Sequence, residues 1–194
     1  MTKYSATASA SYRGTSTANS TATGNTLCEA KENAKKSALT SAKFALVPPP
    51  HVDVNQDTCK DLILSCIDFR FVDDAGYYMN IKGNCNNYDQ FVLAGASLGY
   101  NGISGYENWI LCCNQHINLS YELHGISEIT IFDHLNCGGY KLEYTPEQLE
   151  GDGEFNLHVE NLNKAEKTLK EKYSFLEKVN KIIFDLNFNA IIIP

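Results

Sequence analysis

Asp61-Leu-Ile-Leu-Ser-Cys66 is a brief apolar run that ends in a polar turn. A run of this length is too short for a typical helix and predicts a buried β-strand. The pattern recurs at Gln90-Phe-Val-Leu-Ala94, which is followed by Gly95, and at Glu128-Ile-Thr-Ile-Phe-Asp133. We therefore expect three short buried strands in this part of the chain.

Helical patterns separate and follow these strands. From Ser104 to His124 the apolar residues have helical spacing, and Gly125 stands where a C-cap glycine belongs. The face expected to be buried comprises Trp109, Cys112, Cys113, His116, Leu119 and Leu123. A second helix is expected over Glu154–Tyr173, before two further strands at Lys181–Leu186 and Ala190–Pro194. This alternation predicts an α/β fold with a mostly parallel central sheet flanked by helices.

The sequence divides into three segments. Residues 1–25 are rich in Ser, Thr and Ala, and such a composition cannot bury enough apolar surface to fold alone. This segment is either a flexible tail or an assembly arm whose alternating small residues form strands against a neighbouring chain. Residues 26–50 combine a helical pattern over Thr26–Leu46 with Pro48-Pro49-Pro50, which ends the helix and forms a stiff linker. Residues 51–194 are expected to form one globular domain.

The composition argues against several classes of partner. The 194-residue chain carries a formal net charge of −7 without a run of Lys or Arg, so no nucleic-acid partner is expected, because phosphate binding needs clustered positive charge. No stretch approaches the ~18 uninterrupted apolar residues of a membrane span. Residues 1–24 lack the apolar core of a signal peptide. We expect a protein of the cytoplasm or another reducing compartment, with a virion as the alternative.

Seven cysteines are many for this length, and an odd number cannot pair completely within one molecule. In a reducing compartment, cysteines close to a histidine are more often metal ligands than crosslinks. Cys66 follows the first predicted strand, and His134-Leu-Asn-Cys137 follows the third. Because ligand sites in open α/β sheets gather at the carboxyl ends of the strands, we expect the two clusters to meet at one edge of the sheet.

Two thiolates and one imidazole form a donor set suited to tetrahedral zinc, with the fourth position open to water, substrate or Asp68. We therefore predict one Zn²⁺ per chain, bound by Cys66, His134 and Cys137. Since two thiolates neutralise the dication, a bound water is acidified less than at a site of three histidines, and a neighbouring carboxylate becomes useful. Asp68 is suitably placed, and Arg70 can hold its carboxylate away from the metal through two hydrogen bonds. Without that clamp, Asp68 is a candidate fourth ligand.

Three motifs together carry a resemblance to a known family. Cys66-Ile-Asp-Phe-Arg70, Ala94-Gly95 and Asp133-His-Leu-Asn-Cys-Gly-Gly139 resemble the signature of the β-class carbonic anhydrases. The resemblance implies that the two cysteines and the histidine bind zinc, and that Asp68 and Arg70 form a gating and proton-accepting pair. It also implies that Ala94, Gly95 and Gly138 shape the substrate pocket, and that the protein is a homodimer or a larger homo-oligomer.

The sequence departs from the family after the second strand. Typical members carry a polar Arg-Asn-Ala-Gly-Asn-like segment where this chain has Val92-Leu-Ala-Gly-Ala96, so polar pocket groups are missing or replaced. Ala94 and Gly95 still permit a close backbone approach to a small ligand. The segment from Gly76 to Tyr88, rich in Asn, Tyr and Gly, is interpreted as an insertion that reshapes the entrance.

The implied activity is zinc-dependent, reversible hydration of carbon dioxide to bicarbonate. Two alternatives remain open. One is a catalytically silent, zinc-stabilised structural or assembly protein on the same fold, since metal binding contributes folding free energy with or without turnover. The other is a hydrolase of carbon disulfide or carbonyl sulfide, for which a narrower and more apolar pocket, lined by Val92 and Leu93, would be suitable.

Outside these motifs the sequence favours structural roles. Cys112 and Cys113 are predicted to be small core residues. Core or interface packing is preferred over a proton-shuttle role for His116 and His124. Cys59 lies outside any ligand spacing.

Overall fold

The computed structural model describes residues 4–12, 16–24, 33 and 55–194. The chain forms two compact units, 1–54 and 55–194. In the first unit, β1 (Tyr4–Tyr12) and β2 (Ser16–Gly24) pair antiparallel, so the Ser/Thr/Ala-rich segment pairs with itself as a hairpin. Its role as a tail or an assembly arm stays a prediction. Apart from Asn33, the predicted helix and the proline triplet lie outside the described residues.

The second unit is built on a five-stranded sheet with the order β4-β3-β5-β6-β7. Its strands are β3 (Asp61–Ser65), β4 (Tyr88–Val92), β5 (Glu128–His134), β6 (Lys178–Phe184) and β7 (Ala190–Ile193). The first four run parallel, and β7 pairs antiparallel with β6 at the edge. The predicted mostly parallel sheet is confirmed, and a strand lies near each of the five expected places. The prediction that the second strand is buried is wrong, because β4 lies at the edge of the sheet and none of its residues is fully buried.

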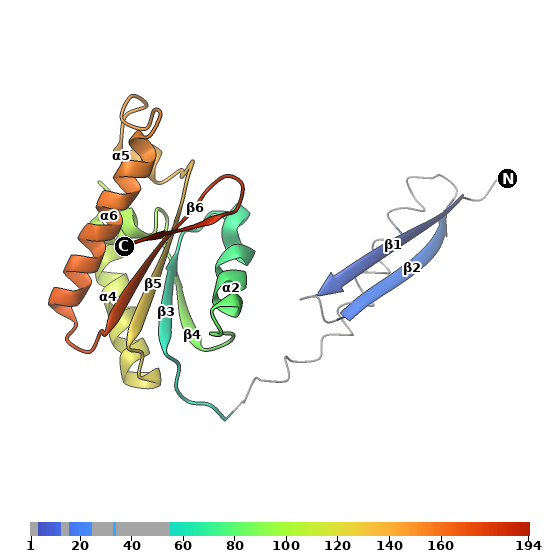
Figure 1. Ribbon diagram of the computed structural model, residues 1–194, viewed down its shortest axis with the longest axis horizontal. Helices are drawn as coiled ribbons and strands as arrows, with labels where there is room; N and C mark the ends of the chain where they lie inside the picture. The colour runs from blue at the N-terminus through green and yellow to red at the C-terminus, as the bar shows by residue number, and fades with distance from the viewer. Residues whose placement is uncertain (1–3, 13–15, 25–32, 34–54) are drawn as a thin grey trace. The chain divides into compact units, whose positions relative to one another are not determined.

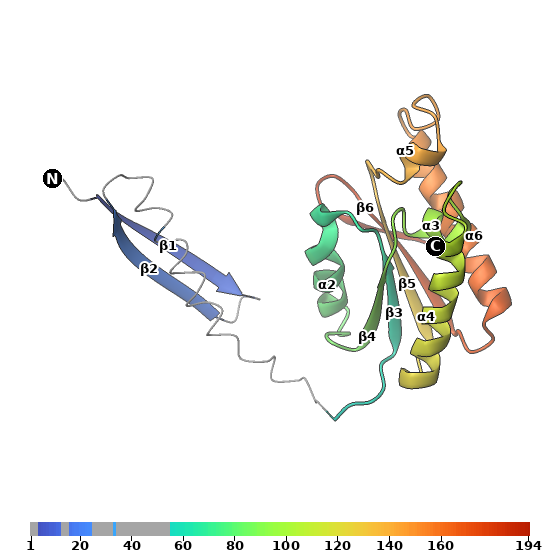
Figure 2. The same cartoon turned by 180° about the vertical axis from the view of Figure 1, so that it is seen from behind.

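Helices cover both faces of this sheet (Figure 1; Figure 2). The helical elements are η1 (Phe69–Phe71), α2 (Val72–Ile81), α3 (Ser97–Asn101), α4 (Asn108–His124), α5 (Tyr140–Glu143) and α6 (Gly153–Lys172). The α2 helix lies on one face, and α3, α4 and α6 lie on the other. Within the part of the chain that the structure describes, none of the helices combines the length and apolar character needed to cross a membrane.

The core has one apolar cluster on each face of the sheet. Leu62 and Leu64 of β3 pack into the cluster beneath α4 and α6, whereas Ile63 between them packs into the cluster beneath α2. Successive side chains of a strand point to opposite faces, so a strand covered on both sides is apolar at every position. This explains why the strand runs in the sequence are continuous rather than alternating.

The predicted buried face of α4 is wrong in part. Cys113 is buried as expected, whereas four other members of that face are exposed: Cys112, His116, Leu119 and Leu123. The buried stripe instead includes the polar Asn114 and Ser120. Asn114 is stabilised there because its Oδ1 accepts a 2.7 Å hydrogen bond from the Tyr173 hydroxyl, and buried polar groups are tolerated when they are hydrogen-bonded.

The segment from Gly76 to Tyr88 begins inside a helix, because its first part up to Ile81 is the second half of α2. Its interpretation as an insertion that reshapes the entrance stays a prediction. Ala75 and Met79, four residues apart, lie on the same side of this helix and are buried against the sheet. Tertiary packing therefore outweighs the weak helix propensity of the Gly and Asn residues here.

Asp61, at the start of β3, carries a pH-dependent cost of folding. The carboxyl is buried; Thr130 Oγ1 donates a 2.6 Å hydrogen bond to Oδ2, and Oδ1 has no hydrogen-bond partner. Burial raises the pKa of Asp61 to about 6, compared with ~3.9 in an unfolded chain. The folded state therefore favours the neutral acid, and stability present below pH ~4 is lost as the pH rises through the folded-state pKa.

Replacing Asp61 by asparagine is expected to remove this pH dependence. As the pH rises from 4 to 8, the wild type should lose up to about 3 kcal/mol of its free energy of unfolding, from a pKa shift of roughly two units. The variant should not lose this amount, so its stability relative to the wild type should increase over the same range. Urea unfolding across this pH range measures the difference. Asp73→Asn, at an exposed position of α2, is the control. A gap between the Asp61 variant and the wild type that is constant with pH would contradict the prediction.

Candidate metal centre and active site

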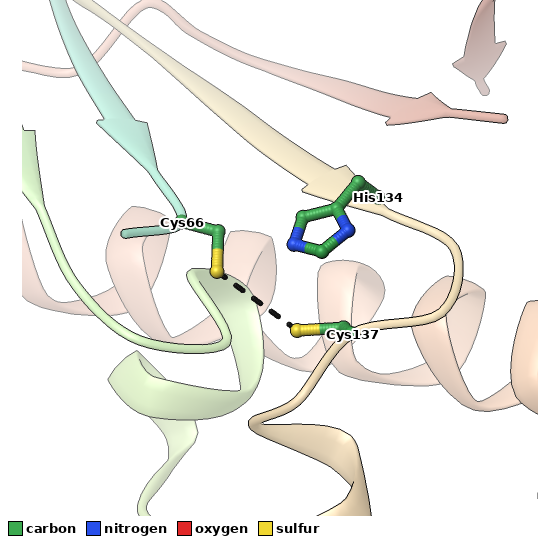
Figure 3. A group of neighbouring side chains, drawn as sticks. All are labelled: Cys66, His134 and Cys137. Carbon is green, nitrogen blue, oxygen red and sulfur yellow. Dashed lines mark hydrogen bonds between the residues drawn. The ribbon is translucent and has the colours of Figure 1, made fainter. Parts of the chain in front are cut away.

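The three predicted zinc ligands converge at the carboxyl ends of adjacent parallel strands. Cys66 directly follows β3, His134 is the last residue of β5, and Cys137 lies in the loop after it. Their ligand atoms all lie within 4.8 Å of one another, and the two sulfur atoms are 3.9 Å apart. Figure 3 shows the His134 ring and both sulfurs facing a common space.

The geometry of this group fits a tetrahedral metal. Two sulfurs each ~2.3 Å from a zinc ion at the tetrahedral angle would lie ~3.8 Å apart, close to the separation found here. The His134 Nδ1 lies 3.0 Å from the Leu135 carbonyl oxygen and donates to it, while the buried Nε2 has no hydrogen-bond partner. A backbone hydrogen bond at Nδ1 leaves the lone pair of Nε2 for a ligand. The donor set therefore suits Zn²⁺.

The two cysteine sulfurs lie within hydrogen-bonding distance of each other. Their contact lowers the pKa of Cys66, and the same contact, with burial, raises the pKa of Cys137. The Gly95 amide also donates to Cys66 Sγ, at 3.4 Å. Both contacts favour the thiolate of Cys66, which is the form that ligates metals.

Asp68 and Arg70 form a bidentate ion pair beside this group. Arg70 Nε donates to Asp68 Oδ1 at 2.9 Å, and Nη2 donates to Oδ2 at 2.7 Å. Nη2 also donates to the Asn136 carbonyl oxygen, which ties the pair to the loop carrying Cys137. The hydrogen bonds from Arg70 lower the pKa of Asp68 to about 2. The carboxylate is ionised, and its Oδ2 lies 3.8 Å from His134 Nε2.

A small aromatic pocket opens at the same ends of the strands. Its lining comprises Ser65, Cys66, Phe71, Ala75, Phe132, Asp133, His134 and Phe184. The Phe71 ring stacks on the His134 ring with centroids 4.5 Å apart. None of these phenylalanines was predicted as a site residue from the sequence. Phe184 could have been found by the same strand-end rule, because it lies opposite His134 in the register of β6 and β5.

The predicted substrate-pocket residues lie elsewhere around the cluster. None of Ala94, Gly95 and Gly138 lines the aromatic pocket. Gly95 has a left-handed φ of 73° and directs its amide toward Cys66. A Cβ at Gly138 would meet nothing within 4 Å, whereas one at Gly139 would lie 2.9 Å from Gly95 Cα. The loop after β5 can therefore lie this close to the loop after β4 because residue 139 is a glycine. The pocket role of Ala94, Gly95 and Gly138 stays a prediction.

Replacing Gly139 by alanine is expected to destabilise the domain by about 1–3 kcal/mol, because backbone atoms of Gly95 must move to admit the methyl group. Gly138→Ala is a matched control one residue away, with open space at its Cβ, and should change stability by less than about 0.5 kcal/mol. Denaturant unfolding of both variants measures the effect. Equal stabilities would show that the loops separate without cost.

Behind the metal group lies a buried polar network centred on Asp133. Its Oδ2 accepts hydrogen bonds from Ser97 Oγ at 2.5 Å, from the Tyr140 hydroxyl at 3.0 Å and from His158 Nδ1 at 2.8 Å. No pattern in the sequence predicted this network. Four donors, including the Ser97 amide, satisfy the carboxylate, which explains how a charged residue is accommodated in the core directly before His134.

The fold and the site together define a β-carbonic-anhydrase-like domain: a mostly parallel sheet with a Cys/His/Cys group at its carboxyl edge, beside an Asp–Arg pair. Residues 56–190 match the protein family described as "Putative carbonic anhydrase". Because this match covers more than half of the chain, the chain belongs to that family.

Two bacterial proteins are similar in sequence to part of this chain, and a solved structure shares its fold. An uncharacterized protein of Rickettsia bellii is 36% identical over 117 residues, which cover 60% of this chain and 71% of that protein. An uncharacterized protein of Rickettsia conorii is 37% identical over 117 residues, 60% of this chain and 62% of that protein. One of two tetrameric β-carbonic anhydrases of Sordaria macrospora superposes with a TM-score of 0.51 at 16% identity, covering 84% of this chain and 96% of that chain. This last similarity shows the fold.

Proposed function

We propose that this protein is a zinc-dependent carbonic anhydrase that catalyses the reversible hydration of carbon dioxide. The observation that carries the proposal is the group of two sulfurs and an unpartnered, buried imidazole nitrogen within 4.8 Å of one another, beside an ionised carboxylate. The family match supports it. Cys66, His134 and Cys137 would hold the ion.

Zinc bound to these three side chains would supply the positive charge that makes a water molecule acidic enough to act as a nucleophile near neutral pH. Asp68 has the role of proton acceptor, because its carboxylate is ionised and lies near His134 Nε2. Arg70 orients that carboxylate through its two hydrogen bonds, and this pairing would keep it from ligating the metal. Release of Arg70 would free Asp68 to bind the metal instead.

The pocket beside the cluster suits a small apolar substrate. Its cavity volume is about 10 Å³, and three phenylalanine rings contribute to its walls: Phe71, Phe132 and Phe184. A cavity of roughly 10–15 Å³ holds about one water molecule, so this pocket admits only a very small molecule. Carbon dioxide, which is linear and has no net charge, fits this description.

Stopped-flow measurement of carbon dioxide hydration by the zinc-loaded chain tests the proposal. A rate well above the uncatalysed reaction that disappears when zinc is removed by a chelator is expected. A background rate from fully loaded protein would overturn the proposal. That result would favour a zinc-stabilised structural protein, for which the missing polar side chains of Val92–Ala96 are an argument.

The aromatic lining also favours a second candidate activity, the hydrolysis of carbon disulfide or carbonyl sulfide by the same groups. Both substrates are more polarizable than carbon dioxide, and a pocket walled by phenylalanine offers them dispersion contacts. A sulfide-release assay on the same zinc-loaded sample distinguishes the activities. Release of sulfide faster than hydration of carbon dioxide would favour the hydrolase.

We further propose that the active form is a homo-oligomer. Three large apolar side chains beside Asp68 and Arg70 are strongly exposed in the single chain: Ile67, Phe69 and Val72, at 63%, 86% and 59%. Several exposed large apolar side chains within one short segment are typical of an interface between proteins. The tetrameric state of the Sordaria macrospora enzymes is in line with this. Sedimentation analysis of the full chain measures the oligomeric state.

A further inference from the structure

A second group of potential metal ligands lies at the amino edge of the sheet. Cys59 stands two residues before β3, Asp89 is the second residue of β4, and His124 is the last residue of α4. One ligand atom from each of the three side chains lies within 4.8 Å of the others. The strand β3, five residues and roughly 17 Å long at ~3.3 Å per residue, separates this group from Cys66.

Backbone contacts hold the three segments together without any ion. The amide of Cys59 donates a 3.0 Å hydrogen bond to the carbonyl oxygen of His124, which joins the end of α4 to the segment entering β3. The two segments lie at the same end of the sheet (Figure 1; Figure 2). Gly125, with a left-handed φ of 69°, ends α4 directly after His124. The group is therefore part of the ordered fold rather than of a loose loop.

The side chains are also oriented by specific hydrogen bonds. His124 Nδ1 lies 2.7 Å from Asp89 Oδ2, and the Ser120 hydroxyl, one helical turn before His124, donates to the same oxygen. Outer partners of this kind fix the orientation of metal-binding carboxylates and imidazoles.

The donor atoms of the group are of the types that bind transition metals. A cysteine sulfur, a carboxylate oxygen and an imidazole nitrogen are all ligands of zinc in proteins, and one atom of each kind lies within 4.8 Å of the others. All three residues are half-buried, so an ion can reach them from solvent.

We propose that Cys59, Asp89 and His124 form a second binding site for a divalent transition metal of the zinc class. One thiolate, one carboxylate and one neutral imidazole balance a dication, and a solvent molecule takes the fourth tetrahedral position. The site lies at the opposite end of the sheet from the aromatic pocket and is independent of the proposed hydration reaction. Its function is to tie the end of α4 to the starts of β3 and β4.

Counting metal ions in the full chain tests the proposal. Metal-free protein is loaded with Zn²⁺, and the bound ions per chain are counted by native mass spectrometry and by competition with a chromophoric chelator. Cys59→Ser and His124→Gln should each bind one ion fewer than the wild type. Two matched variants should bind as many ions as the wild type: Cys85→Ser, and His116→Gln, an exposed histidine of the same helix.

A Co²⁺ titration separates this site from the first. The Cys66→Ser/Cys137→Ser double variant should retain a thiolate-to-cobalt absorption band, and adding Cys59→Ser should abolish it. His124→Gln in the intact chain should weaken the affinity of one ion by at least ~100-fold while leaving the other unchanged. Equal ion counts in the wild type and the Cys59→Ser variant would overturn the proposal. Failure of the hydration assay would not affect it.

Discussion

Replacing Cys66 by serine is expected to weaken zinc binding at the carboxyl edge of the sheet by at least ~1,000-fold, because one of two thiolates that neutralise the ion is lost. Serine keeps the size of the side chain but remains a protonated alcohol near neutral pH. In the wild type, free zinc at about 100 times its dissociation constant should stabilise the fold by about 2.7 kcal/mol. The variant should show no such gain from this site. Chelator competition and thermal unfolding with and without zinc measure both effects.

Cys112→Ser provides the control for that experiment. Cys112 is an exposed cysteine of α4 and lies outside both metal-ligand groups of the described residues. The Cys112→Ser variant should bind its tightest zinc ion with the same affinity as the wild type, and zinc should stabilise it by the same amount. If Cys66→Ser bound zinc as tightly as this control, the two strand ends would not form the metal centre, and the proposed function would lose its foundation.

Replacing Asp68 by asparagine is expected to lower the rate of carbon dioxide hydration by roughly 100- to 10,000-fold, the contribution typical of general acid–base catalysis. Asparagine keeps the shape of the side chain, but it cannot accept a proton and it loses the charge that pairs with Arg70. The zinc content should not change, since Asp68 is outside the group of three ligand atoms. Stopped-flow hydration on samples of matched zinc content measures the effect.

Asp73→Asn, which removes an exposed carboxylate five residues further along the chain, should hydrate carbon dioxide at the wild-type rate. This control separates the loss of a specific proton acceptor from a general change in surface charge. A full hydration rate in the Asp68 variant would exclude this carboxylate as the acceptor. It would also leave the bidentate pair with Arg70 as a purely structural contact.

The strands could be predicted because their signal is local. The core of β3 is apolar at Leu62, Ile63 and Leu64, and both faces of the strand are covered, so the apolar run itself marks the element. The rule that sites form at the carboxyl ends of parallel strands then brought Cys66 and His134 together from distant parts of the chain. The proximity of these two residues followed from the predicted topology and needed no measured distance.

The direction of each helix face could not be predicted in the same way. On α4, the apolar residues Leu119 and Leu123 predicted a buried face, yet both are exposed. Ser120 is buried instead, and its hydroxyl donates to Asp89 on a neighbouring strand. Whether a polar side chain can be buried depends on a partner across the fold, and sequence spacing within the helix carries no information about that partner.

The second metal-ligand group was missed for a related reason. Cys59 was set aside because no ligand spacing surrounds it, whereas its proposed partners lie 30 and 65 positions away at Asp89 and His124. The amino ends of parallel strands have no general rule that marks them as sites. Only the packing of α4 across the sheet brings a helix end next to two strand starts.

The sequence alone determined the α/β architecture, the strands and the identity of the Cys/His/Cys group, since each depends on residue types that are contiguous or lie at the ends of strands. Only the tertiary structure decided which helix faces are buried, how Phe71 and Phe184 surround His134, and that Gly139 rather than Gly138 admits the neighbouring loop. These features depend on contacts between segments far apart in the chain. Such contacts are selected by packing and by hydrogen-bond satisfaction in the folded state, and a linear pattern does not contain them.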